Sequence, residues 1–149
     1  MKAICKKYES LELNELYAIL QLRTEVFVVE QNCVYQDMDD KDQLAYHVMI
    51  FNEKKLVATS RLLAEGISYD NYSSIGRICS SPLHRRQGLG LQIVKESILF
   101  NEELFPEYSI KISAQTYLKK FYTSFGFEAI GEDYLEDDIP HIAMIRKKK

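Results

Sequence analysis

The sequence predicts an α/β domain that has one mixed sheet with helices on both of its faces. Short runs of alternating apolar and polar residues, typical of strands, are separated by longer segments of helical periodicity. The chain has 149 residues, of which 46% are hydrophobic. That is enough for one buried core and hardly enough for two, so we expect residues 1–149 to form a single domain.

The N-terminal half begins with an expected strand, Ala3 to Tyr8, which a helix follows. Asn14 is a suitable N-cap residue for this helix. The helix carries Leu16, Ile19, Leu20, Arg23 and Phe27. A polar loop, Asn32 to Asp42, comes next. Two apolar runs joined by a short polar turn at Asn52 to Lys55 then predict a hairpin over residues 46–63.

The C-terminal half continues this alternation. We expect a central strand at Ser73 to Cys79 and a long helix at Leu89 to Phe100. One stripe of that helix carries Leu91, Val94, Ile98 and, loosely, Leu99. The remaining expected elements are a strand at Tyr108 to Ala114, a helix that contains Tyr122, and strands at Phe127 to Ile130 and Ile142 to Ile145.

The turn between the central strand and the long helix is the most informative segment. It runs Ser80-Ser-Pro-Leu-His-Arg-Arg-Gln-Gly-Leu-Gly90. N–H groups at a helix N-terminus attract anions, and Gly88 and Gly90 let a phosphate approach the backbone. Arg85 and Arg86 add positive charge. The alternative is that the glycines serve only tight packing of the strand against the helix. Neither a P-loop nor a dinucleotide-binding pattern is present, so an anion bound at this turn would belong to another kind of ligand.

Two segments, Arg85-x-x-Gly88-x-Gly90 and Ala114 to Phe127, occur in an order that has a family parallel. They resemble the pyrophosphate-binding turn and the closing strand and helix of the GNAT superfamily of N-acetyltransferases. Three further segments resemble its ElaA-like branch: Leu22 to Asn32, Tyr35 to Asp39 and Asp137 to His141. The resemblance spans nearly the whole chain. It implies the GNAT acyl-CoA N-acyltransferase fold, whose central mixed sheet is mostly antiparallel.

The same resemblance implies acetyl-CoA as acyl donor and direct transfer to a primary amine in a ternary complex. The residues that it assigns to acetyl-CoA are Ile78, Cys79, Ser80, Arg85, Arg86, Gln87, Gly88, Leu89, Gly90 and Gln115. Tyr122 matches the tyrosine that donates a proton to the CoA thiolate, and a phenol with a reference pKa of about 10 is protonated at neutral pH. Alternatively, Tyr122 serves packing, since Tyr117, Phe121 and Phe125 share its helical spacing.

The base that deprotonates the amine is left open between water and several side chains. The polar candidates are Glu30, Asp37, Asp39, His47 and His141. His141 is the best of the histidines because it lies in the ElaA-like ending, and a packed or solvated histidine is the alternative. Arg23 either pairs with an acidic residue of the loop at 36–42 or binds an acidic group of the substrate. Arg23, Glu30, Asp39 and His141 are therefore the candidate acceptor-binding residues.

Charge and cysteine content exclude several other classes of protein. The formal net charge of −3 argues against a nucleic-acid binder, and the basic end Arg146 to Lys149 is expected to be solvated. Three cysteines without a CxxC pair or a leader segment favour the cytoplasm and no metal site. No apolar run approaches the ~18 residues of a membrane span. We expect a small-molecule or protein amine as acceptor, and a monomer or homodimer.

Two alternative functions use the same residues. A non-catalytic regulatory protein would bind CoA through the same turn and would need no acid at the sulfur, so Tyr122 discriminates between the two. An acyl-homoserine lactone synthase would share the arrangement of Arg23, Phe27 and the acidic loop. Those synthases are longer and carry a tryptophan-containing substrate loop, whereas this chain has no tryptophan.

Overall fold

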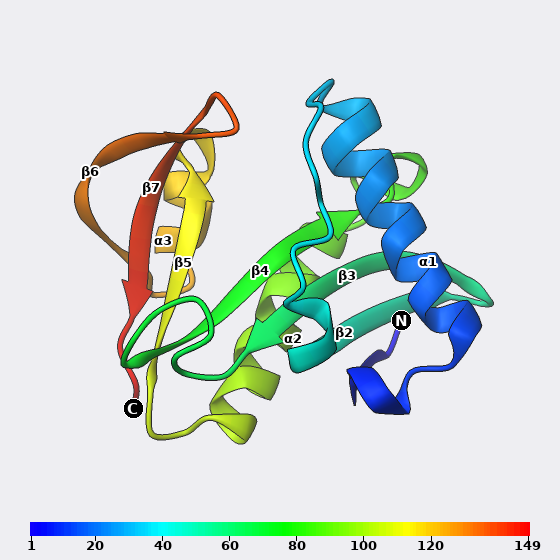
Figure 1. The fold of residues 1–149 in the computed structure, drawn as a ribbon, viewed down its shortest axis with the longest axis horizontal. Helices are drawn as coiled ribbons and strands as arrows, with labels where there is room; N and C mark the ends of the chain where they lie inside the picture. The colour runs from blue at the N-terminus through cyan, green and yellow to red at the C-terminus, as the bar shows by residue number, and fades with distance from the viewer.

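The computed structural model describes residues 1–149 and contains one seven-stranded sheet in the order β1-β2-β3-β4-β5-β7-β6 (Figure 1). The strands are β1 (Ala3–Lys7), β2 (Tyr46–Asn52), β3 (Lys55–Leu63), β4 (Tyr72–Ser80), β5 (Ser109–Gln115), β6 (Glu128–Glu136) and β7 (Ile139–Arg146). The α-helices are α1 (Leu13–Arg23), α2 (Leu89–Leu104) and α3 (Lys119–Thr123). Neighbouring strands are antiparallel except β4 and β5. This confirms the predicted mixed, mostly antiparallel sheet.

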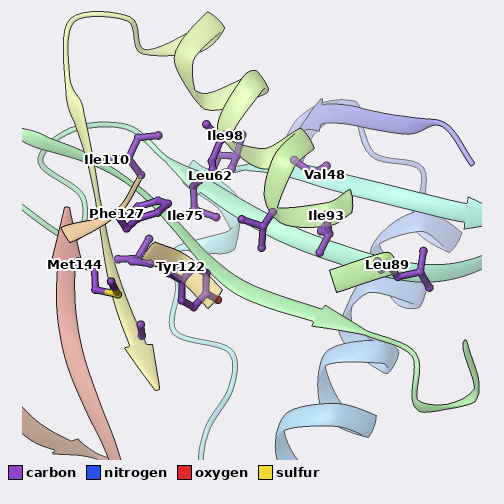
Figure 2. Packing of buried hydrophobic residues seen from close by; sticks show 14 of the residues in the cluster. Val48, Leu62, Ile75, Leu89, Ile93, Ile98, Ile110, Tyr122, Phe127 and Met144 are labelled. Atoms are coloured by element: carbon purple, nitrogen blue, oxygen red, sulfur yellow. The ribbon is translucent and has the colours of Figure 1, made fainter. Parts of the chain in front are cut away.

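Helices cover both faces of the sheet, as the sequence predicts. The larger core lies between the sheet, α2 and α3 (Figure 2), and a smaller core lies beneath α1 on the other face. Strand β2 serves both cores because side chains alternate along a strand. Val48 and Ile50 join the larger core, and Met49 between them joins the smaller one with Ile19 and Leu22 of α1.

Helix α1 begins earlier than expected, and the predicted N-cap at Asn14 is wrong. Glu12 is the N-cap, and it forms a capping box with Glu15, whose Oε1 accepts the Glu12 backbone N–H at 2.8 Å. Two glutamates therefore satisfy end groups that Asn14 was expected to satisfy. Beyond Arg23 the helix widens into a π-helical segment, Thr24–Glu30, in which residues five apart are hydrogen-bonded.

The predicted apolar stripe of α2 is only half correct. Val94 and Ile98 are buried, but Leu91 and Leu99 are 57% and 51% exposed. Their expected places are taken partly by polar residues, because the sheet beneath α2 also carries polar groups. Ser97 Oγ lies 2.6 Å from Ser60 Oγ of β3, and Asn101 is hydrogen-bonded to Ser73 and Ser74 of β4. The other buried α2 residues are Leu89 and Ile93.

The last two strands are much longer than predicted. Strand β6 is an edge strand, and nearly all of its side chains are exposed, so it lacks the alternation that marks a half-buried strand. Its pairing with β7 shifts register between Ile130 and Tyr134, where Gly131 has a φ of +70°. Asp137 and Asp138, both at positive φ, form the turn that returns the chain into β7.

Strands β4 and β5 diverge, and this divergence positions the site. They pair in parallel over Tyr72 to Ser74 only, opposite Ser109 to Lys111. Figure 1 shows the two arrows pointing away from one another beyond that point. Strand β5 is held on its other edge by β7, from Ile110 to Gln115. The carboxyl ends of two neighbouring parallel strands are therefore left apart, which is where α/β proteins bind ligands.

Candidate active site

A cleft of about 1260 Å³ lies where β4 and β5 diverge. Its walls come from β4, the start of α2, the β5–α3 segment, the β6–β7 turn and the loop that follows α1. The predicted site residues that line it are Glu30, Asp39, Ile78, Cys79, Ser80, Arg85, Gly90, Gln115, Tyr122 and His141. Those that do not line it are Arg23, Arg86, Gln87, Gly88 and Leu89.

The β4 wall offers backbone rather than side chains. Cys79 and Ser80 pair with Thr59 and Ala58 of β3, but β4 has no ladder partner on its β5 side after Ser74. Backbone N–H and C=O groups on that edge therefore remain to be satisfied by a ligand or by water. The Cys79 side chain is buried in the smaller core, and burial raises its pKa to about 12. A protonated, buried thiol is a poor nucleophile.

The turn from β4 into α2 ends at backbone N–H groups that have no hydrogen-bond partner within the helix. Gly88, at φ +74°, is the N-cap of the 16-residue helix α2 and has no side chain to cap it. The first helical bond is from Gln92 N to Gly88 O, so the N–H groups of Leu89, Gly90 and Leu91 precede the intrahelical ladder. Nothing lies within 4 Å of where a Cβ would stand at Gly88 or Gly90. The helix start is thus accessible to an anion. Leu89 contributes only backbone there, since its side chain is in the larger core.

Arg85 and Glu30 form a bidentate ion pair across the mouth of the cleft. The Nη2–Oε1 distance is 2.5 Å, and Nη1 contacts Oε2. This hydrogen bonding to Glu30 raises the pKa of Arg85. The pair joins the end of the π-helical segment that follows α1 to the glycine turn that precedes α2. Glu30, expected as a substrate or base residue, is therefore held by the residue expected to bind phosphate.

Tyr122 both packs and lines the cleft. Its ring is 7% exposed and lies edge-on to Phe127, with 6.0 Å between ring centroids (Figure 2). Burial, with a smaller effect from Tyr117, raises its pKa to about 12. The phenol is therefore a proton donor throughout the neutral range. Tyr117 is 75% exposed, and Phe121 packs against Tyr122 at 5.2 Å.

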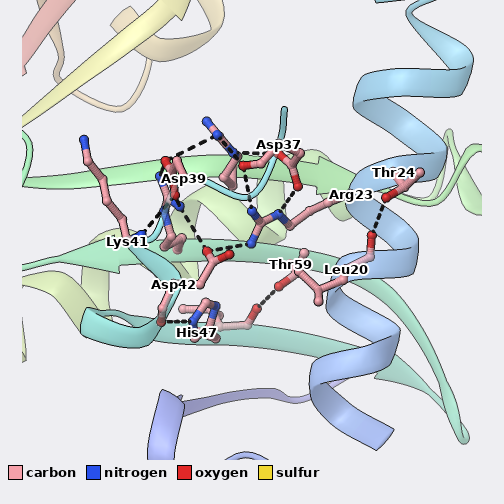
Figure 3. A network of polar contacts seen from close by, with 12 residues as sticks. Leu20, Arg23, Thr24, Asp37, Asp39, Lys41, Asp42, His47 and Thr59 are labelled. Carbon is pink, nitrogen blue, oxygen red and sulfur yellow. Dashed lines mark hydrogen bonds and ion pairs between the residues drawn. The ribbon is translucent and has the colours of Figure 1, made fainter. Parts of the chain in front are cut away.

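An ion network fixes the loop that follows α1 (Figure 3). Arg23, which is 1% exposed, contacts Asp37 through Nε at 2.9 Å and Asp42 through Nη1 at 2.8 Å. Although burial opposes its charge, these carboxylates raise the pKa of Arg23. The structure thus pairs Arg23 with the acidic loop, one of its two expected roles. Asp37, named as a possible base, is engaged in the same network.

The network continues to the cleft through two arginines that sequence reasoning missed. Arg61 of β3 contacts both oxygens of Asp39, at 2.8 and 2.9 Å, and Asp42 at 3.0 Å. Arg77 of β4 contacts Asp37 at 2.8 Å and lies at φ +48°, within a bulge opposite β3. A left-handed residue in a strand turns its side chain away from the regular alternation. The available signal was Arg61 itself, the one charged residue between Leu56 and Leu63 of a strand that is largely buried.

The three histidines have different surroundings. His47 is buried, its Nε2 lies 2.9 Å from the Asp42 carbonyl oxygen, and burial lowers its pKa. His84 lies beside Ser81 Oγ, outside the cleft. His141 lines the cleft, pairs with Gln115 across the β5–β7 ladder, and is 6% exposed.

No group of three or more His, Cys, Asp or Glu side chains is placed to hold a metal ion. None of the helices combines the length and the hydrophobicity that crossing a membrane requires.

The Asp39 carboxylate should make the protein sensitive to acid. Burial opposes its charge, but hydrogen bonds and charge from Arg61 lower its pKa to about 2. A depressed pKa contributes stability that is present above the unfolded-state pKa of about 3.9 and is lost as the pH falls towards 2. Asp39→Asn should therefore lower the free energy of unfolding by about 1–2 kcal/mol at neutral pH, allowing for partial solvent screening. The difference from wild type should shrink as the pH approaches 2.

Urea denaturation of both proteins across this pH range measures the effect. Asp40→Asn is the matched control, because Asp40 is exposed and asparagine tolerates its left-handed backbone. A destabilisation by Asp39→Asn that stayed constant with pH would contradict the ionic role of Asp39.

The comparisons with known proteins agree with this architecture. A GNAT acetyltransferase domain model matches residues 8–148. The chain is 38% identical to Protein ElaA of Escherichia coli over 142 residues, which cover 94% of this chain and 92% of ElaA. The crystal structure of Escherichia coli ElaA matches with a TM-score of 0.91 at 36% identity, covering 98% of this chain and 99% of that one.

A solved acyl-CoA N-acyltransferase from Pseudomonas aeruginosa also has a TM-score of 0.91, at 43% identity, covering 98% of this chain and 99% of the other. A more distant structure, an N-acetyltransferase from Thermoplasma acidophilum in complex with coenzyme A, shares the fold with a TM-score of 0.68 at 14% identity, covering 99% of each chain. The chain belongs to the GNAT family of acetyltransferases, and it is an acyltransferase.

Proposed function

We propose that this acyltransferase moves an acetyl group from acetyl-CoA to a primary amine while both are bound in one ternary complex. The observation that carries the proposal is the arrangement along one cleft. The N-terminus of α2, which no side chain caps, lies at one end of the cleft. The unpaired edge of β4 runs along the cleft, and Tyr122 and His141 line it.

The glycine turn fits the pyrophosphate of CoA. The N–H groups of Leu89 and Gly90 would donate to the phosphate oxygens, and the left-handed Gly88 leaves room for them. Arg85 would add a guanidinium at the same mouth, and the exposed Arg86 and Gln87 lie beside it.

The pantetheine arm fits the unpaired edge of β4. Backbone groups of Ile78, Cys79 and Ser80 would hold it through hydrogen bonds of the kind that a neighbouring strand would make. Gln115, at the end of β5, would contribute its amide from the opposite wall. The strand edge would thus recognise the pantetheine arm through backbone hydrogen bonds rather than through side chains.

Acetyl-CoA supplies an acyl group activated as a thioester. Tyr122 would hold a proton for the departing thiolate sulfur, and its pKa of about 12 keeps that proton in place until it is needed. The acceptor would enter between the β6–β7 turn and the loop after α1, where Glu136 and Asp137 carry negative charge. Such a wall suits a cationic amine, whether of a small molecule or of a protein.

Binding at the glycine turn is tested by placing a negative charge there. Gly88→Asp should weaken acetyl-CoA binding at least about fivefold relative to Gly88→Asn, since one unit charge near another costs about 1–4 kcal/mol at 4 Å outside the interior. The two variants share the same shape and the same strain at φ +74°, so they differ only in charge. Calorimetric titration at fixed salt measures both affinities. Equal affinities would place the phosphates elsewhere, and no binding by the wild type would remove the proposal.

The acid role is tested by Tyr122→Phe. The ring and its packing against Phe127 remain, so the affinity for acetyl-CoA should not change, while kcat should fall roughly 10²-fold because the proton donor is lost. Thiol release is measured with ethylamine, spermidine or a lysine peptide as the amine. Tyr17→Phe, on the exposed face of α1, is the control. An unchanged kcat would assign Tyr122 to packing alone.

The Glu30–Arg85 pair should compete with the cofactor. Phosphate can engage the Arg85 guanidinium fully only if Glu30 releases it, and an exposed ion pair is worth about 0.2–1 kcal/mol. Glu30→Gln should therefore tighten CoA binding by up to about fivefold. Glu25→Gln, which makes the same charge change outside the cleft, should leave the affinity unaltered. Weaker binding by Glu30→Gln would mean that Glu30 helps to hold Arg85 in its binding position.

A further inference from the structure

His141 is the histidine of the cleft, and its ring is anchored at one nitrogen. Nδ1 lies 2.6 Å from the main-chain oxygen of Ile139. A carbonyl oxygen only accepts hydrogen bonds, so Nδ1 must carry the proton. In the neutral ring, Nε2 is therefore the unprotonated nitrogen. Stacking on Tyr134, with 6.2 Å between ring centroids and 24° between ring planes, fixes the ring orientation as well.

The free nitrogen of His141 faces a carboxylate. Nε2 lies 3.4 Å from Oε2 of Glu136, which is about half exposed, and Oε1 of Glu136 lies 3.4 Å from Ser113 Oγ. Tyr134 also contacts Ser113. With a neutral imidazole, Nε2 and the carboxylate are both acceptors, so the pair lacks a donor. A primary ammonium group carries three N–H donors and would satisfy both at once.

Of the three other carboxylates that line the cleft, Glu30 and Asp39 are engaged by arginines and are therefore less suited to remove a proton. Glu30 is paired with Arg85. The pKa of Asp39 is lowered to about 2 by Arg61, despite the opposing effect of burial. Tyr134 on β6 stacks on the His141 ring. Tyr69 also lines the cleft, and burial, together with the charges of Tyr134 and Glu136, raises its pKa to about 12, while the Lys111 amine lies 4.7 Å from its ring centroid.

We propose that His141 is the base that deprotonates the acceptor ammonium, and that Glu136 is the positioning residue that holds this ammonium against Nε2. The inference rests on the proposed transfer to an amine. His141 Nε2 takes one proton from the ammonium and passes it to water. The amine nitrogen then bonds to the acyl carbon as the carbon–sulfur bond breaks. Tyr122 gives its proton to the sulfur, and the second proton lost by nitrogen restores the phenol through water. One proton is released overall.

The protonation state of the His141 imidazole can be measured without any acyl acceptor present. Three histidines are present, so ¹⁵N-histidine labelling and a His141→Asn spectrum identify the signals of His141. At alkaline pH the multiple-bond ¹⁵N–¹H pattern should report a proton on Nδ1 and none on Nε2. A proton on Nε2 would overturn the proposal.

The base role is tested with two probe nucleophiles, ethylamine and hydroxylamine. Ethylamine is an ammonium ion at neutral pH, as lysine is, whereas hydroxylamine is uncharged and has no ammonium proton to lose before attack. His141→Asn keeps a donor for the Ile139 oxygen and removes Nε2. It should lower kcat/KM for ethylamine roughly 10²-fold and leave hydroxylamine nearly unchanged. Equal loss with both probes, or no loss with either, would overturn the proposal.

Glu136→Gln should raise KM for ethylamine more than for hydroxylamine, and Glu132→Gln, exposed on the same strand, is its control. Calorimetry with acetyl-CoA distinguishes a failure of the proposed function from a failure of the proposed role of His141. A wild type that does not bind acetyl-CoA defeats the proposed function, while a wild type that binds it but is insensitive to His141→Asn defeats only this inference. If the wild type acetylates neither probe, the histidine spectrum decides.

Discussion

The rest of the site depends on one constraint, the separation of β4 from β5 after three paired residues. An unpaired strand edge inside a sheet is costly, because each buried N–H and C=O needs a partner. Two features sustain the separation. Strand β7 pairs with the other edge of β5 as far as Gln115 and keeps β5 in the sheet, and the side chains of Ile112, Tyr122 and Phe127 fill the space beside α2 with apolar contacts. The unpaired edges are those of β4 beyond Ser74 and of β5 beyond Lys111, where the two strands diverge at the cleft. A pantetheine arm, whose amides resemble a peptide, is the kind of ligand that such an edge can pair with.

The ion network fixes the wall of the cleft that is formed by the loop at 32–42. Three arginines and three aspartates meet between α1, β3, β4 and the loop at 32–42 (Figure 3). Their charges balance, and buried ion pairs seldom add much net stability compared with apolar packing. Their value here is positional. The loop has hardly any regular structure of its own, and Asp37, Asp39 and Asp42 fix it at three points against the sheet. The left-handed backbone of Arg77 belongs to the same arrangement, because the β4 bulge turns this side chain towards Asp37.

The sequence predicted the sheet, its helices and the glycine turn before α2 because those elements have local signals: alternation, helical period and glycine. It failed where tertiary contacts override the local pattern. Ser97 and Asn101 are buried beneath α2 because hydrogen bonds to β3 and β4 satisfy them, which no helical stripe reveals. Strand β6 is charged and exposed, so its nine residues show no strand period. Asp39 and Glu30 were recognised as polar residues near a site, but their arginine partners lie 22 and 55 residues away in the chain. Such pairings depend on the folded topology, which spacing alone does not give.

The two ends of the cleft differ in charge, and this difference accounts for how a weakly acidic protein could take two unlike reagents. The net charge of −3 would by itself repel an anionic cofactor. The start of α2 and Arg85 provide a local positive end, and a helix start acts only within about one turn. Glu136 and Asp137 line the cleft at the β6–β7 turn and make that part of the wall negative. In the proposed reaction, CoA phosphates and a cationic amine are therefore each attracted to a different end. Their reactive atoms would meet between these ends, beside the phenol of Tyr122, so that charge separation along the cleft orients both reagents before any bond is formed.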